Sequence, residues 1–452
     1  MAARQAAAPR APARPTIDPY PALARAALLL AWAPGFGLGL YLLLGIVLQW
    51  DVGAGWLPLG QAHGHAQVFG FTALFILAVG TVLFPRFLSA PLTRPRQARL
   101  GGILIAVGVG LRFLLQPLEA GLTRGVGLVL AAALELVGAG LFAHATLGVA
   151  RASIQPWAAW RRALALGLGS LVLGYLLNLA ASLELAGGRA IVSPALDEAL
   201  LHLGIWGFIV PVTLAVGLKI FPQFLLLRPP RARLFGPAIV AYGIGMALVV
   251  AGWLVQGWRP ELIAEARWLR LGGWSTQTAA LLLHTFALRL FEPAARRSGM
   301  PHITNPTRLW FRLAFGWLLV AVALGAFFAA RESTTGSAVG FVEASAQRHA
   351  LTMGYLLPLL VGMAGRILPG FSGEMTRRPR VLAGMVWLLL VGATLRVGGQ
   401  LLGGYVGLAG MLTALGGTLA FLGFAWFAWL LWPTLGRKPG AVPPARGDRD
   451  GV

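Results

Sequence analysis

The sequence predicts an all-α integral membrane protein with about twelve transmembrane helices, arranged as three repeats of four helices. Composition is the first observation behind this prediction. Hydrophobic residues make up 57% of the 452 residues and charged residues 12%, and the mean hydropathy is +0.74. Because a soluble domain carries about 25% charged residues, a soluble globular protein is excluded.

The second observation is a stretch that occurs three times. It begins at His65 as HAQVFGFTALFILAVGTVLFPRF, at His202 as HLGIWGFIVPVTLAVGLKIFPQF and at His349 as HALTMGYLLPLLVGMAGRILPGF. Each copy has glycine five residues after the histidine, then an aromatic residue, with proline at plus twenty and phenylalanine at plus twenty-two. Agreement at fixed positions over this length indicates an internal repeat.

The third observation is the number of apolar segments long enough to cross a bilayer, which takes about 20 residues. The repeated stretches are the second, sixth and tenth of them, so the units cover about 25–150, 160–292 and 308–432 within one domain, 25–432. The twelve segments lie near 26–49, 60–87, 99–116, 125–149, 163–184, 196–224, 234–256, 270–291, 310–330, 343–371, 381–401 and 406–432.

The two ends of the chain have a different composition. Residues 1–24 are rich in alanine, proline and arginine, and residues 433–452 in proline, glycine and charge. Segments of this kind bury too little apolar surface to fold. We therefore expect a disordered cationic tail before the membrane domain and a flexible tail after it.

The net charge of +22 is distributed in alternate loops. Arginines follow the second, sixth and tenth segments and lie between the fourth and fifth and between the eighth and ninth, whereas the opposite loops hold most of the acids. The positive-inside rule then predicts a multi-pass protein with both termini in the cytoplasm. The charge is thus a topology signal with attraction to the lipid bilayer, and we expect no nucleic-acid partner.

The repeated histidines are expected inside the membrane near its outer face. Ser193 and Pro194 suit the start of the sixth helix, which places His202 roughly 13 Å into that helix. Three convergent histidines favour metal or haem ligation, and the alternative is a structural role inherited from a triplicated ancestor. The glycine at plus five lets another helix or a flat ligand approach the backbone. Cysteine is absent, which excludes thiolate ligands and disulfides.

Two arginines also recur at a fixed distance. Arg112 and Arg396 each follow the repeated histidine of their unit by 47 residues, and Gln116 and Gln400 follow four residues later. The middle unit offers only Gln256, without the arginine. An arginine inside a membrane normally has a partner, and no acidic residue recurs beside these two. We therefore expect an anionic ligand, such as a haem propionate, to bind them.

Other polar residues are less informative. Glu135 is either part of a proton path or a packed, protonated acid. His63 lies about 200° around the helix from His65, so the two are not expected to share a metal. His144 and His284 are expected at the membrane interface rather than as ligands.

These features resemble known families. Twelve helices in three units, with histidines on helices two, six and ten, resemble subunit I of the haem–copper oxidases. The local sequences HGHAQVFGFTALFILAVGTVLFPRF and RHALTMGYLLPLLVGMAGRILPGFSG are similar to the NnrS family, membrane proteins described as containing haem and copper and linked to nitric oxide resistance. The resemblance covers about residues 25–432.

The resemblance implies haem ligation by His65 and His349, with His202 on a copper-ligand helix. The departures are equally clear. The seventh helix has no adjacent histidine pair, the sixth has no His-Pro-Glu-Val-Tyr run, and the tenth has one histidine. A complete oxidase-type haem–copper centre cannot be assembled from these residues, so proton-pumping oxygen reduction is not expected.

The expected function is that of an inner-membrane haem protein in nitric oxide stress resistance or nitrogen-oxide metabolism, with copper as a candidate second metal. An electron donor would act from the outer face, and any enzymatic activity would be that of an oxidoreductase on nitric oxide or a related diatomic. Two alternatives stay open: a transporter of a small anion and a non-catalytic assembly factor. Transporters more often show two inverted repeats, whereas these three units run in the same direction.

Overall fold

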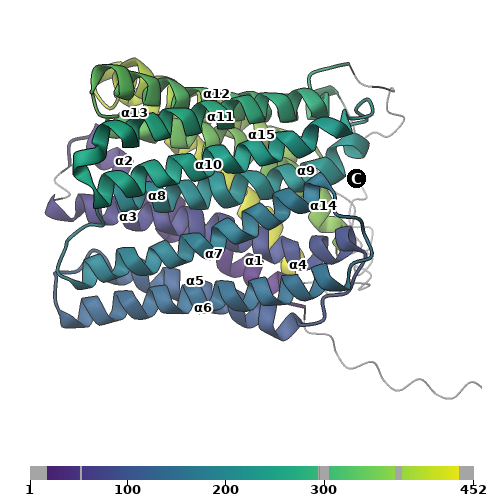
Figure 1. Cartoon of the computed structure of the whole chain (residues 1–452), viewed down its shortest axis with the longest axis horizontal. Helices are drawn as coiled ribbons and strands as arrows, with labels where there is room; N and C mark the ends of the chain where they lie inside the picture. The colour runs from purple at the N-terminus through teal and green to yellow at the C-terminus, as the bar shows by residue number, and fades with distance from the viewer. Residues whose placement is uncertain (1–17, 51–52, 294, 296–304, 372–378, 437–452) are drawn as a thin grey trace, which may run out of the picture.

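The computed structural model describes residues 18–50, 53–293, 295, 305–371 and 379–436. In these residues the chain forms helices joined by short turns, without strands. The helices lie side by side as twelve long rods that run the length of the molecule (Figure 1). The all-helical membrane fold predicted from the sequence is confirmed.

Eight rods are single helices. Their bounds are α5 Pro95–Leu115, α6 Leu122–Ala152, α7 Ala159–Ala186, α10 Phe235–Trp258, α11 Ile263–Leu288, α12 Asn305–Thr335, α15 Pro379–Gly403 and α16 Gly407–Leu431.

Four rods contain a π-helical segment (η) between two α-helices. They are α1 Tyr20–Leu30, η1 Ala31–Gly37 and α2 Leu38–Val47; α3 Trp56–His65, η3 Ala66–Ala73 and α4 Leu74–Leu88; α8 Pro194–His202, η4 Leu203–Ile209 and α9 Val210–Phe224; and α13 Phe341–His349, η7 Ala350–Leu356 and α14 Leu357–Phe371. Short 3₁₀ turns add η2 Gly53–Gly55, η5 Ala232–Leu234, η6 Pro260–Leu262 and η8 Trp432–Gly436.

Among the described residues, ten rods are long and apolar enough to cross a membrane. The other two are α11 and the rod that joins α13 to α14. Their lengths match the rest, but α11 begins with charged residues (Glu265, Arg267, Arg270) that lower its hydropathy. The result agrees with the expectation of about twelve spans and identifies a multi-pass membrane protein in a lipid bilayer.

The rods that carry the repeated histidines form the centre of the bundle. The apolar windows of the α3–α4 and α8–α9 rods are 78% and 89% buried, compared with 33% to 50% for the other spans. The α4, α9 and α14 helices meet around an apolar cavity of about 710 Å³ that is partly open to the outside. The outer rods instead expose leucine, valine and phenylalanine, as a helix facing lipid does.

A π-helical segment follows each repeated histidine immediately, as η3, η4 and η7. Such segments are rare and occur frequently at functional sites. Their hydrogen bonds join residues five apart, so each repeated histidine stands at the start of a widened turn that ends at the glycine or just beyond it.

The glycines at plus five are in contact with neighbouring rods. A Cβ added at Gly70, Gly207 or Gly354 would lie within 2.5 to 2.8 Å of Val109, Ser170 or Trp317. Two roles were predicted for these glycines, and the structure shows one of them, the close approach of another helix.

A second set of glycines aligns the third and fourth rods of every unit. Each lies 43 residues after its histidine, and an added Cβ would come within 2.5 to 2.9 Å of a carbonyl oxygen of the fourth rod (Gly108, Gly245, Gly392). The next backbone nitrogens met on that rod belong to Glu135, Gln277 and Ala420, at 3.2, 2.8 and 3.1 Å. These three residues therefore occupy equivalent positions.

Candidate functional site

His65 faces the fourth rod of its own unit. Its Nε2 lies 2.8 Å from Oε2 of Glu135, and the two side chains are 2% and 0% exposed. Asn178 Nδ2 donates to the same oxygen at 3.2 Å, and Phe69 stacks on the imidazole with ring centroids 4.9 Å apart. The Nε2 of His65 is therefore already engaged by the protein.

His202 has the same arrangement in the second unit. Its Nε2 lies 3.0 Å from Nε2 of Gln277, the residue that corresponds to Glu135. Trp274 packs edge-on against the imidazole at 5.0 Å. The first two repeated histidines thus join the second rod of their unit to the fourth.

His349 has no such partner, because the equivalent residue is Ala420. Its Nδ1 instead lies 2.7 Å from the carbonyl oxygen of Ser345, one turn earlier in α13. A carbonyl oxygen only accepts hydrogen bonds, so Nδ1 carries the proton and Nε2 has a free lone pair. This is the arrangement in which histidine binds metals, with the other ring nitrogen held by a carbonyl.

His63 has the same arrangement from the opposite side. Its Nδ1 lies 2.8 Å from the carbonyl oxygen of Gly35 in η1, and its ring lies against Gly39, where any Cβ would clash with it. His63 and His349 both lie near Arg396. The structure therefore brings His349 together with His63, while His65 faces away toward α6.

Arg396 is a buried cation at this site. It is 8% exposed, and its Nε has no hydrogen-bond partner among the described residues. Gln400 donates to Ser345 Oγ at 2.8 Å and to the Tyr405 hydroxyl at 2.9 Å, while its buried Oε1 also has no partner there. A guanidinium buried in this way fits an anionic ligand, as the sequence predicted.

Arg112 is different, because protein groups surround it. It donates to Asn178 Oδ1 through Nη1 and to Gln116 Oε1 through Nε, the latter at 3.0 Å. Gln116 in turn donates to Gln61 Oε1 at 3.1 Å, and Arg112 interacts electrostatically with Glu135. The matching offsets of Arg112 and Arg396 therefore conceal different surroundings, and Arg112 needs no external anion.

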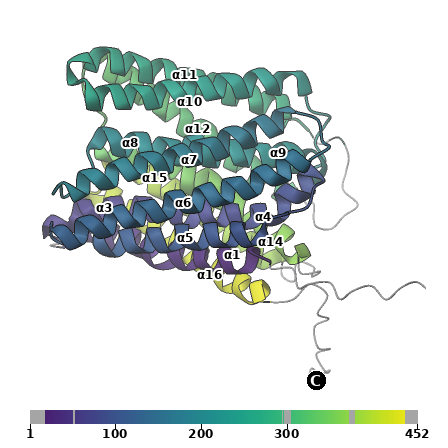
Figure 2. The same cartoon turned by 60° about the horizontal axis from the view of Figure 1, so that its bottom comes forward.

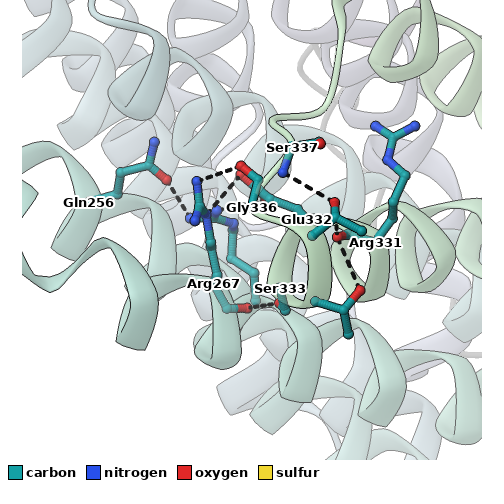
Figure 3. Close-up of polar contacts among 10 residues, drawn as sticks. Gln256, Arg267, Arg331, Glu332, Ser333, Gly336 and Ser337 are labelled. Carbon is teal, nitrogen blue, oxygen red and sulfur yellow. Dashed lines mark hydrogen bonds and ion pairs between the residues drawn. The ribbon is translucent and has the colours of Figure 1, made fainter.

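The comparison of Gln256 with Gln116 and Gln400 is wrong. Gln256 follows its histidine by 54 residues, but the other two follow by 51, so its position is not equivalent. Its Oε1 accepts from Arg270 Nη1 at 2.6 Å, and Figure 3 shows it in a polar cluster that joins α10, α11 and α12.

Arg270 is the buried arginine of the second unit, and sequence analysis missed it. It lies 2.8 Å from Glu332 and 4.1 Å above the Trp253 ring, and Arg267 lies near the same carboxylate. Its position on the fourth rod rather than the third hid it from a search at fixed offsets. Because its partners are all in the protein, this cluster is structural.

The two remaining membrane histidines also differ. His144 is exposed on α6, where a residue of the membrane interface would be. His284 is 2% exposed, and neither of its ring nitrogens has a partner among the described residues. His284 therefore packs inside the bundle, near the end of α11.

The arrangement fits a haem better than a copper ion. The described residues contain no group of three or more histidine, cysteine, aspartate or glutamate side chains that could hold a metal ion. A haem iron needs only one or two axial imidazoles from the protein. His63 and His349 can supply these, and Arg396 can neutralise a propionate.

Fold and site together define a multi-pass helical membrane protein with the architecture of a haem–copper oxidase. The chain is similar in structure to a solved haem–copper terminal oxidase dimer, with a TM-score of 0.68 and 15% sequence identity over 94% of this chain and 85% of that one. The family model described as NnrS protein matches residues 20–438, and the chain belongs to this family. A comparison with curated proteins finds no match.

Proposed function

We propose that this chain is a haem protein of the bacterial inner membrane that acts in the nitric oxide response, with the haem held by His63 and His349. One observation carries the proposal: both imidazoles have Nδ1 fixed by a backbone carbonyl, and within the described part of the chain neither Nε2 has a protein partner. The proposal replaces the His65–His349 pair expected from sequence, because His65 Nε2 is bound to Glu135.

Each element of the site has a role in this proposal. Gly35 and Gly39 present a backbone surface on which the His63 ring rests. Ser345 orients His349, and Gln400 orients Ser345. Arg396 binds a propionate by a charge-assisted hydrogen bond. Bound haem would supply one-electron chemistry, and a diatomic gas would bind to it only if one of the two imidazoles were displaced.

The orientation in the membrane is the one proposed from the sequence. The arginine-rich loops after α4, α6 and α9 lie at the same end of the bundle as the start of α1 and η8, and we assign this end to the cytoplasm. The histidines lie toward the opposite end, so an electron donor would act from the outer face. Any activity on nitric oxide or a related diatomic would be an oxidoreduction. His65 and His202 become packing residues, and no copper ligand set is assigned.

The test is an optical spectrum with iron analysis on purified protein from haem-replete cells. We expect a Soret band, a reduced-minus-oxidised difference spectrum and about one haem per chain. His63→Ala and His349→Ala should each remove at least nine-tenths of the haem, whereas His202→Ala, the matched control, should retain it. Retention in His63→Ala, with loss in both His65→Ala and His349→Ala, would restore the pairing expected from sequence.

A colourless, folded, iron-free preparation would contradict the proposal as a whole. The buried Arg396 would then favour the alternative of a transporter for a small anion.

A further inference from the structure

Two basic corners lie at the end of the bundle opposite the histidines, and they differ in charge balance. The first lies at the end of α11. There the carboxylate of Glu292 is within 2.7 to 3.8 Å of three arginines (Arg228, Arg231, Arg289). Arg231 and Arg289 also donate to backbone carbonyls. The carboxylate therefore balances one of the three positive charges, and carbonyl groups hold two of the arginines in place.

The second, the α6–α7 corner, is not balanced in this way. We define it by five cations and two apolar residues at the ends of α6, α7 and α9 and in the loops beside them (Arg94, Arg151, Arg161, Arg162, Lys219, Ile154, Trp157). None of the five cations is in an ion pair within the described part of the chain. Figure 2 shows this end of α6 at the right of the bundle.

Contacts within the corner keep several of its cations in place. Arg161 donates to the carbonyl oxygen of Ala150 at 3.2 Å and lies 5.0 Å from the Trp157 ring. Lys219 Nζ lies 4.4 Å from the Trp160 ring. Arg94 Nη1 lies beside Gly148, near the end of α6. The positive charge is thus concentrated and partly ordered before any ligand arrives.

The apolar residues place the corner at the membrane surface. Ile154 and Trp157 are 86% and 59% exposed, in the loop between the end of α6 and the start of α7. A tryptophan where two spans end is typical of the headgroup layer. An anion that binds here would meet the cations on one side and acyl chains on the other.

We propose that the α6–α7 corner binds the phosphate of an anionic phospholipid headgroup. Arginine and lysine side chains donate charge-assisted hydrogen bonds to phosphate oxygens, and basic pockets between transmembrane helices bind such headgroups. The exposed apolar pair selects a lipid over a phosphate ion free in solution. In the corner around Glu292 a carboxylate already pairs with the arginines, so this corner does not bind the phosphate in the same way.

The experiment is native mass spectrometry of the full chain with phosphatidylglycerol, with phosphatidylcholine as the neutral lipid. Arg151→Gln with Arg162→Gln removes two cations that make no structural hydrogen bond in the described residues. Each cation contributes about fivefold to affinity, so the double variant should bind phosphatidylglycerol about 25-fold more weakly. Arg228→Gln with Arg289→Gln, the matched control, should change binding less than threefold.

Three outcomes would overturn the proposal. These are a change below twofold in the Arg151–Arg162 variant, an equal loss in the control, and complete competition by inorganic phosphate without preference for the lipid. The melting temperature of every variant confirms that it is folded. None of these readouts depends on haem, so they test the corner separately from the proposed function.

Discussion

The first and third units differ at one position that changes what the histidine can do. In the first unit Glu135 binds His65, and in the second Gln277 binds His202. In the third unit the same position is Ala420, and His349 turns to a carbonyl of its own helix instead. The helix packing is alike in all three. The identity of a single residue on the fourth rod therefore separates a structural histidine from a candidate ligand.

The largest effect is expected when the third unit receives, at position 420, the glutamine that the second unit has at the equivalent position. Ala420→Gln should offer His349 a partner and direct its Nε2 away from the haem. We expect the purified variant to lose most of its haem, measured by the Soret absorbance per protein. Ala420→Leu adds similar bulk without a hydrogen bond. Equal haem loss in the leucine variant would show that volume, not the amide, is responsible.

The two arginines give the next largest effect. Arg396→Leu should weaken haem retention roughly 10- to 100-fold, because a hydrogen bond to a charged group is worth about 1.5–3 kcal/mol. Arg112→Leu should retain haem but lower stability by about 1–3 kcal/mol, since it leaves the buried oxygens of Asn178 and Gln116 without their donor. Haem titration and thermal unfolding separate the two effects. Equal haem loss in both variants would restore the role predicted for Arg112 from sequence.

The smallest effect is expected for Glu135 and Gln277, the residues on the fourth rods that contact the repeated histidines. Glu135→Leu and Gln277→Leu should each destabilise the protein by about 1–3 kcal/mol, the cost of an unsatisfied buried group. Glu135→Gln should recover part of the loss, because an amide can still bond to His65 Nε2. Denaturant unfolding measures all three. Haem occupancy should stay unchanged in each variant, and its loss in Glu135→Leu alone would make His65 a ligand after all.

The sequence predicted the architecture because the lengths of apolar segments and the spacing of repeated residues can be read directly from it. Apolar lengths predicted the rods, and the spacing from His65 to Arg112 and from His349 to Arg396 predicted buried arginines. The direction of each side chain was not predictable in this way. His63 was set aside because it lies across the helix from His65, yet that face is the one that meets the third unit.

Partners without a repeat were also invisible in the sequence. Glu135 lies 70 residues after His65 and has no acidic counterpart in the other units. Arg270 lies on a different rod from Arg112 and Arg396. Both became recognisable only when the packed glycines showed which positions correspond. The glycine that follows each repeated histidine by 43 residues was the one signal in the sequence that could have shown which positions correspond.

The π-helical segments after the histidines also show what the three units share. They follow the repeated histidine in all three units, including the second, where that histidine is bound to Gln277. The widened turn therefore does not depend on what the histidine binds. What distinguishes the third unit is the side chain on its fourth rod, not the backbone around its histidine.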